Sequence, residues 1–131
     1  MRYILLLFIT TYLLHANIVI VTNKDSNINS LSKESIKSIY LAKINKINNI
    51  TIEPLLCKNE KLCEKFVNKI LNKSMSQYNS YWTRLVFKGK KAISRKFNND
   101  EIVKKLNNLN TIAFIEKKDL KENWKVIYEA D

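Results

Sequence analysis

Hydrophobic positions along this 131-residue chain fall into short apolar runs that alternate with helical stripes. The clearest run is residues 18–21, which is β-branched throughout and therefore typical of a buried strand. Pro54 falls within a second run, and since proline cannot donate to a sheet ladder, it indicates an edge position or an early end for that strand. Four strands are predicted, at residues 18–21, 50–56, 111–115 and 124–128.

Helical spacing of apolar side chains marks four further segments. The clearest is residues 59–71, which carry one apolar stripe and lysines on the other face. Gly89 lies where the third helix needs a residue in the left-handed conformation to end it. The four predicted helices are residues 32–41, 59–71, 74–89 and 99–109, with N-caps at Ser32, at Ser74 or Ser76, and at Asn99 or Asp100.

The elements therefore follow the order strand, helix, strand, three helices and two strands. This alternation favours the α/β class, with a mixed β-sheet flanked by helices. The chain contains one glycine and one proline, and it shows no repeat, linker or glycine-rich phosphate loop. We predict a single compact domain.

The N-terminal segment has the pattern of a secretory signal peptide. Arg2 precedes an apolar run at residues 4–14, and the small residue Ala16 closes it. The run is shorter than the ~20 residues that span a bilayer. We predict a signal peptide at residues 1–16, a mature domain at residues 17–131 and a periplasmic location. An uncleaved N-terminal anchor is the alternative.

The formal net charge of +11 suggests anionic partners. Beyond residue 16, however, the only arginines are Arg84 and Arg95, and the lysines are spread evenly among asparagine and isoleucine. Readers of bases and phosphates favour arginine forks, and a Lys/Asn/Ile bias also arises from compositional drift. We therefore expect no nucleic-acid partner.

Three stretches together resemble the periplasmic phosphate-binding proteins of ABC importers and their short single-domain relatives. The first is residues 19–43, where a strand is followed by INSLS and then by a helix ending in IYLAK. The second is residues 74–90, which begin with SMSQ, continue through YW and end in GK. The third is residues 110–115, NTIAFI. The order and spacing of these stretches carry the resemblance, which covers most of the chain beyond residue 16.

The resemblance implies one lobe of the type II periplasmic-binding-protein fold, in which two lobes close on a ligand. One lobe alone is half of a cleft, to be used by itself, as a homo-oligomer or against a separate partner. The family holds phosphate with a Ser-Gly-Thr segment at a helix N-terminus. Here residues 56–63 (LCKNEKLC) contain no serine, threonine or glycine, and Glu60 and Glu64 lie at the start of the helix. Ala42 replaces the family's helix-end glycine.

Open α/β sheets bind ligands beyond the carboxyl ends of their strands. The loops that follow the first two strands therefore supply the candidate anion-contacting residues, and solvated loop residues are the alternative interpretation. These candidates are Thr22, Asn23, Lys24, Lys58 and Asn59.

Two other clusters have a structural and a functional interpretation. Tyr81, Trp82 and Phe87 have helical spacing, which favours a place in the core over a ligand platform. The basic residues at 88–91, together with Arg95, are either a solvated face or a partner-docking patch.

Cys57 and Cys63 are the only cysteines. Outside the cytoplasm they are predicted to form a disulfide that closes a small ring and stabilises the fold by about 2–3 kcal/mol. Alternatively, Cys63 is a small core residue on the helical stripe. Two cysteines without a histidine in the mature chain are too few for a metal site, so we expect no metal and no cofactor.

The mature chain also has no histidine for acid–base work, no C-x-x-C motif and no nucleophile elbow, so we expect a protein that is not an enzyme. Two functional hypotheses follow. The first is an exported solute-binding-like protein that binds phosphate or another small anion. The alternative is a periplasmic accessory or interaction module that keeps the fold, has lost the ligand and binds a periplasmic or membrane protein.

Overall fold

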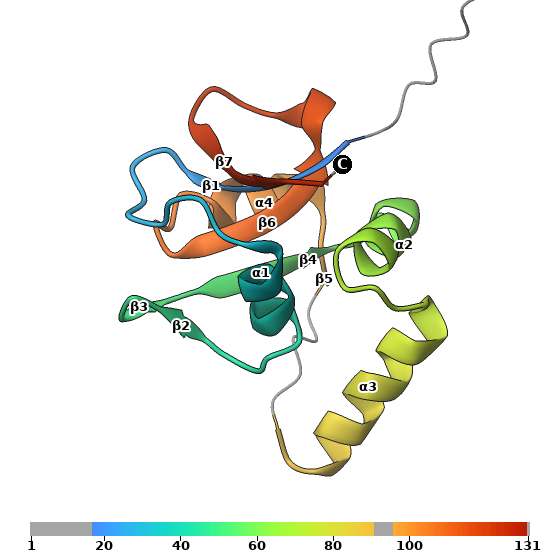
Figure 1. Cartoon of the computed structure of the whole chain (residues 1–131). Coiled ribbons are helices and arrows are strands. Elements are labelled where there is room, and N and C mark those ends of the chain that lie inside the picture. The colour runs from blue at the N-terminus through green and yellow to red at the C-terminus, as the bar shows by residue number, and fades with distance from the viewer. Residues whose placement is uncertain (1–16, 91–95, 131) are drawn as a thin grey trace, which may run out of the picture.

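The structure, a computed structural model, describes residues 17–90 and 96–130 (Figure 1). The predicted signal peptide at residues 1–16 lies outside the described residues, as do Lys91 and Arg95. Within the described ranges, no helix has the length and hydrophobicity needed to cross a membrane. The strands are β1 (Ile18–Asn23), β2 (Lys46–Ile47), β3 (Ile50–Thr51), β4 (Glu53–Cys57), β5 (Lys96–Phe97), β6 (Thr111–Glu116) and β7 (Trp124–Glu129). The helices are α1 (Lys33–Tyr40), α2 (Glu60–Lys69), α3 (Met75–Phe87), α4 (Asn99–Lys105) and a short 3-10 helix, η1 (Lys117–Asp119).

Five strands form one mixed sheet in the order β5-β4-β6-β1-β7, and β2 and β3 form a separate short ribbon. Strand β4 is parallel to β5 and to β6, whereas β1 is antiparallel to β6 and to β7. Strand β1 therefore runs opposite to the other four strands of the sheet. The predicted α/β class with a mixed sheet is confirmed.

The centre of the sheet is buried on both faces. In β1 and in β6 the first five residues are all buried, as expected when helices cover both sides of a strand. Helix α1 lies in front of the sheet in Figure 1, and α4 lies behind it. These covering helices explain why both strands are continuous apolar runs in the sequence.

Three aromatic rings join α1, α2 and β6 in the core. Phe66 of α2 stacks on Phe114 of β6, with ring centroids 4.0 Å apart. Tyr40 of α1 contacts both rings edge-on, and its hydroxyl donates to the carbonyl oxygen of Leu55 in β4. Tyr40 is fully buried. This cluster fixes α1 and α2 against the same part of the sheet.

Each predicted helix is present, as are the predicted strands at residues 18–21, 111–115 and 124–128. The predicted strand at residues 50–56 is divided into β3 and β4, which belong to separate sheets. Strands β2 and β5 were not predicted, because two residues are too few to show a period. Pro54 is not in an edge strand, since β4 pairs with both β5 and β6. Pro54 lies opposite Ile112 of β6, and the pairing of β4 with β5 begins only at Leu56. The proline is therefore tolerated, because no residue of β5 lies opposite it to accept the hydrogen bond that it cannot donate. The N-cap of α4 is Asn98, not Asn99 or Asp100 as predicted.

Candidate functional site

The carboxyl ends of the parallel strands form one edge of the sheet, where two helices begin. Helix α2 starts just after β4, and α4 starts just after β5. The two loops are joined by a hydrogen bond from the Lys58 amide to the Phe97 carbonyl oxygen, at 3.0 Å. Strand β6 ends at this edge as well, and the chain then crosses to β7 through η1. This edge is where an open α/β sheet binds ligands.

A cavity of about 480 Å³ lies at this edge, between the η1 crossover and the first turns of α2 and α4. Its apolar wall comes from the side chains Leu62, Ile102, Val103, Phe114, Ile115, Leu120 and Trp124. Its polar lining comes from Asn59, Asn99, Asp100, Glu116, Lys118, Asp119 and Lys121. A volume of this size accommodates a small molecule.

The charged groups of the cavity are mixed. Among the described residues that line it, three are carboxylates and two are lysines. Lys118 pairs with Glu116 at 3.2 Å and keeps 76% of its side chain exposed. Lys121 holds its ammonium group 5.9 Å from the centre of the Trp124 ring, and the Trp124 indole N–H is buried without a hydrogen-bond partner. The site thus combines two lysines with an apolar wall and an excess of acidic side chains.

Two of the predicted ligand residues lie at this edge. Asn59 lines the cavity and is the N-cap of α2, its side-chain oxygen accepting from the Leu62 amide at 3.2 Å. Lys58 precedes it, with its ammonium nitrogen 4.0 Å from a Glu101 carboxylate oxygen and 61% of its side chain exposed. Such a long, exposed ion pair contributes little stability, so the Lys58 ammonium can turn toward the cavity at small cost.

The other three predicted ligand residues lie at the opposite edge of the sheet, because β1 runs antiparallel to β6. The Thr22 hydroxyl is buried and donates to the Thr111 carbonyl oxygen at 2.8 Å. The Asn23 amide donates to the Leu106 carbonyl oxygen at 3.0 Å, and the Lys24 backbone amide donates to Asn123. The structure therefore does not bring the five predicted residues together. Figure 1 shows β1 and β4 ending on opposite sides of the molecule.

The predicted disulfide is not formed in this structure, in which Cys63 is a free thiol. Cys63 lies on the buried face of α2, only 2% exposed, and burial raises the pKa of its thiol. The alternative interpretation, a small core residue on the helical stripe, matches this position. The side chain of Cys57 lies outside the described part of the chain.

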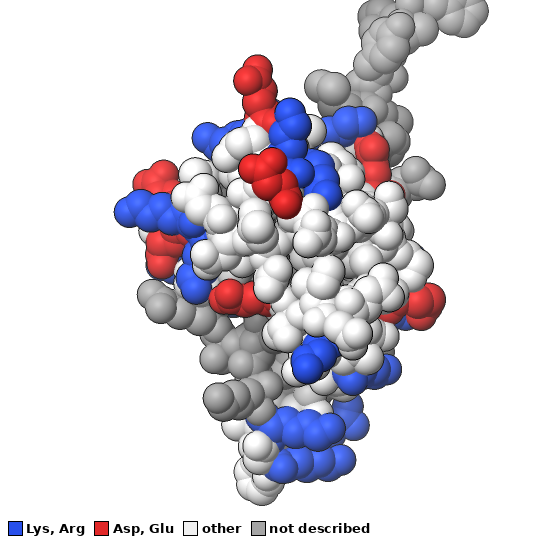
Figure 2. Space-filling view, turned by 90° about the vertical axis from the view of Figure 1, so that its left-hand side faces the viewer, with Lys and Arg blue, Asp and Glu red and all other residues white. Residues whose placement is uncertain are grey.

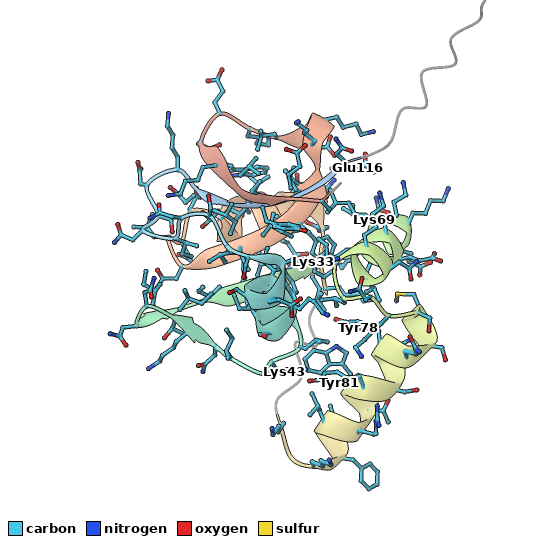
Figure 3. The ribbon with its side chains drawn as sticks, viewed as in Figure 1. Lys33, Lys43, Lys69, Tyr78, Tyr81 and Glu116 are labelled. Carbon is cyan, nitrogen blue, oxygen red and sulfur yellow. The ribbon has the colours of Figure 1, made fainter. Side chains whose placement is uncertain are left out.

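The aromatic residues of α3 divide between core and surface. The Tyr81 hydroxyl donates to the Leu41 carbonyl oxygen at 2.6 Å, and Trp82 is half-buried beside it. Figure 3 shows Tyr78 and Tyr81 pointing from α3 toward the body of the molecule. Burial raises the pKa of Tyr78 to about 12. Phe87 is 93% exposed, so its predicted place in the core is wrong: α3 extends beyond the core before it ends.

Sequence reasoning missed the contribution of the η1 crossover to the cavity. Lys118 and Lys121 follow β6 as Lys58 follows β4, so the same rule about carboxyl ends of strands would have found them. Asp100 was noticed only as a helix cap. Within residues 17–90 and 96–130, no cluster of three or more His, Cys, Asp or Glu side chains could hold a metal ion.

No protein-family model matches the chain, and neither does any curated protein sequence. Solved structures do match. One is described as a phosphate ABC transporter substrate-binding protein from Clostridium perfringens with bound phosphate, with a TM-score of 0.63, 18% identity and coverage of 86% of this chain and 45% of that chain. Another is an ABC-type phosphate transport receptor from Vibrio cholerae, with a TM-score of 0.53, 18% identity and coverage of 86% and 46%.

At this identity the likeness concerns the fold alone. The chain spans less than half the length of either protein, which is consistent with one of two lobes. The resemblance recognised in the sequence is therefore confirmed at the level of the fold.

Proposed function

We propose that this chain is an exported, non-catalytic solute-binding-like protein whose ligand is phosphate or another small anion. The observation that carries the proposal is the cavity at the carboxyl ends of β4 and β6, in a chain with the fold of the phosphate-binding proteins. Export rests on the signal-peptide pattern of residues 1–16.

The chemistry of the edge supplies cations for such a ligand. Lys118 and Lys121 line the cavity, and the exposed Lys58 lies beside it at the start of α2. The N-terminus of a helix carries a partial positive charge, which adds to the attraction for an anion. In this proposal the anion displaces Glu101 from Lys58 and Glu116 from Lys118, so that both ammonium groups contact it.

The chain matches less than half of the length of either structural neighbour. In this proposal a second copy of the chain or a separate periplasmic or membrane protein supplies the other wall of the cleft. Closure of two halves on the anion would exclude water and strengthen each charged contact.

The test is a thermal melt of the full chain with phosphate, sulfate or chloride at matched ionic strength. A ligand at about 100 times its dissociation constant adds about 2.7 kcal/mol of stability, which raises the melting temperature by several degrees. A Lys58→Gln variant should lose most of this shift. Lys65→Gln, a matched change at an exposed position of α2, should keep it. If neither phosphate nor sulfate raises the melting temperature more than chloride does, the anion-binding proposal fails.

One observation favours the second candidate, an interaction module without a ligand. Three carboxylates outnumber two lysines in the cavity, and Asn59 already caps an amide at the α2 N-terminus. This acidic excess opposes the binding of an anion. Under this candidate no oxyanion shifts the melt, and cross-linking in intact cells captures a defined protein through the η1 crossover.

A further inference from the structure

Helix α3 projects from the body of the molecule (Figure 1). Its last turn carries two exposed apolar side chains, Val86 and Phe87. Tyr78, in the first half of the helix, is buried. Val86 is 56% exposed and Phe87 is 93% exposed. Exposing a phenylalanine forgoes much of the free energy that its burial would contribute. A side chain in this position is therefore a candidate for contact with another surface.

Helix α3 ends at Phe87, and the backbone conformation of the next residues terminates it. Gly89 adopts a φ of 80°, its amide donates to the Val86 carbonyl oxygen, and the Lys90 amide donates to the Leu85 carbonyl oxygen. Both bonds are 3.0 Å long and together they form a Schellman motif. The motif defines the end of the helix, with Phe87 in its final turn.

Basic residues flank Phe87 in the sequence, and no acidic residue lies among them. Arg84, Lys88 and Lys90 are all exposed, and residues 75–90 contain no aspartate or glutamate. Among the described residues, none of these three cations takes part in an ion pair. Figure 2 shows basic side chains gathered at the lower end of the molecule with no acidic side chain among them.

We propose that the α3 tip, defined as Arg84, Val86, Phe87, Lys88 and Lys90, docks on an anionic lipid surface. Phe87 and Val86 enter the boundary between headgroups and acyl chains, while the three cations contact lipid phosphate groups. Interfacial segments combine apolar side chains with lysine and arginine in this way. The net charge of +11 adds long-range attraction to the same surface.

The size of the tip favours lipid over a protein partner. A stable protein interface buries about 800 Å² on each side, with a packed apolar centre. The tip offers one aromatic and one aliphatic side chain on the end of a helix, which is too little for such a centre. A bilayer needs no complementary pocket, because it rearranges around an inserted side chain.

The first experiment measures sedimentation of the full chain with phosphatidylglycerol-containing vesicles and with pure phosphatidylcholine vesicles. Every variant retains residues 1–16, so differences between variants report on the tip. Phe87→Ser should weaken binding to the anionic vesicles roughly tenfold. Replacing Lys88 and Lys90 with glutamate should weaken it by at least about 25-fold, since each lysine near an anionic surface contributes about fivefold.

Matched controls lie away from the tip. Leu109→Ser changes an exposed aliphatic side chain, and the Lys61→Glu, Lys65→Glu pair makes the same change in net charge on α2. At an ionic strength that screens long-range attraction, both controls should bind the anionic vesicles within about twofold of the wild type. Equal weakening by the α2 charge pair would show that net charge alone drives binding, and it would overturn the proposal.

The second experiment locates the ring itself. In a Phe87→Trp variant, brominated acyl chains should quench fluorescence beyond the quenching of the native Trp82 and Trp124, and only in anionic vesicles. Absence of this added quenching would overturn the proposal, whatever the sedimentation result. An acidic protein surface would then be the alternative occupant.

Discussion

Replacing Ala42 with glycine should stabilise the folded protein. Ala42 follows α1 and adopts a φ of 55°, in the left-handed region that glycine favours. Its amide donates to the Ile39 carbonyl oxygen at 3.0 Å, and the Lys43 amide donates to the Ser38 carbonyl oxygen at 2.8 Å. The helix therefore ends in the same Schellman motif as α3, with alanine where α3 has Gly89.

The size of the effect follows from two opposing contributions. The left-handed conformation costs a residue with a Cβ about 1–2 kcal/mol. Replacement by glycine removes this cost, but glycine loses more conformational entropy than alanine on folding, which offsets about 0.4–1 kcal/mol of the gain in stability. The Ala42 side chain is exposed, so its removal forfeits little burial. We expect a net gain of about 0.8 kcal/mol, which raises the melting temperature by a few degrees.

Urea denaturation of the full chain measures this change, and Gly89 supplies the matched reverse substitution. A Cβ at Gly89 would meet no atom within 4 Å, so Gly89→Ala tests the backbone alone. It should lower stability by a similar amount. If Ala42→Gly is no more stable than the wild type while Gly89→Ala is less stable, strain at Ala42 is refuted.

Two further predictions concern buried ionisable groups. Burial raises the pKa of Tyr78 from 10.0 to about 12, so its contribution to stability is complete below about pH 10 and is lost as the pH rises through 12. Between neutral pH and about pH 11, the unfolding free energy of the wild type should fall by about 1.4 kcal/mol relative to that of Tyr78→Phe, as measured by urea denaturation. A difference between the two proteins that stays the same over this pH range would contradict the prediction. Cys63 should resist alkylation in the folded protein and react once the protein is unfolded without a reductant. If Cys63 of the unfolded protein reacts only after a reductant is added, then Cys63 is joined to Cys57 in the disulfide predicted from the sequence.

The proposal of solute binding and the proposal of lipid docking can fail independently. The first depends on Lys58 and the cavity at the carboxyl ends of β4 and β6. The second depends on Phe87 and the basic residues near it at the end of α3. If the protein binds vesicles and does not bind phosphate, the result would match the second candidate, an interaction module, located at a membrane surface.

Local pattern was sufficient to predict the longer elements and several of their ends. Helical spacing located α2, because a helix buries one face. Continuous apolar runs located β1 and β6, because a strand covered by helices on both sides buries every side chain. Ser32 and Gly89 were identified as helix ends because their conformations and hydrogen bonds involve only neighbouring residues. Strand β5 was missed because two residues carry no period.

The site depended on long-range pairing. Sequence rules place ligand residues after strands, but they do not state which way each strand runs in the sheet. The antiparallel pairing of β1 with β6 separates Thr22 from Lys58, and the parallel pairing of β4 with β6 brings Lys58 near the η1 crossover. Apolar spacing likewise could not show that Phe87 extends past the core, since burial depends on whether another element covers that turn. The sequence alone determined which segments are strands and helices; tertiary structure decided which of their ends meet, because strand direction and order follow from contacts between residues far apart in the chain.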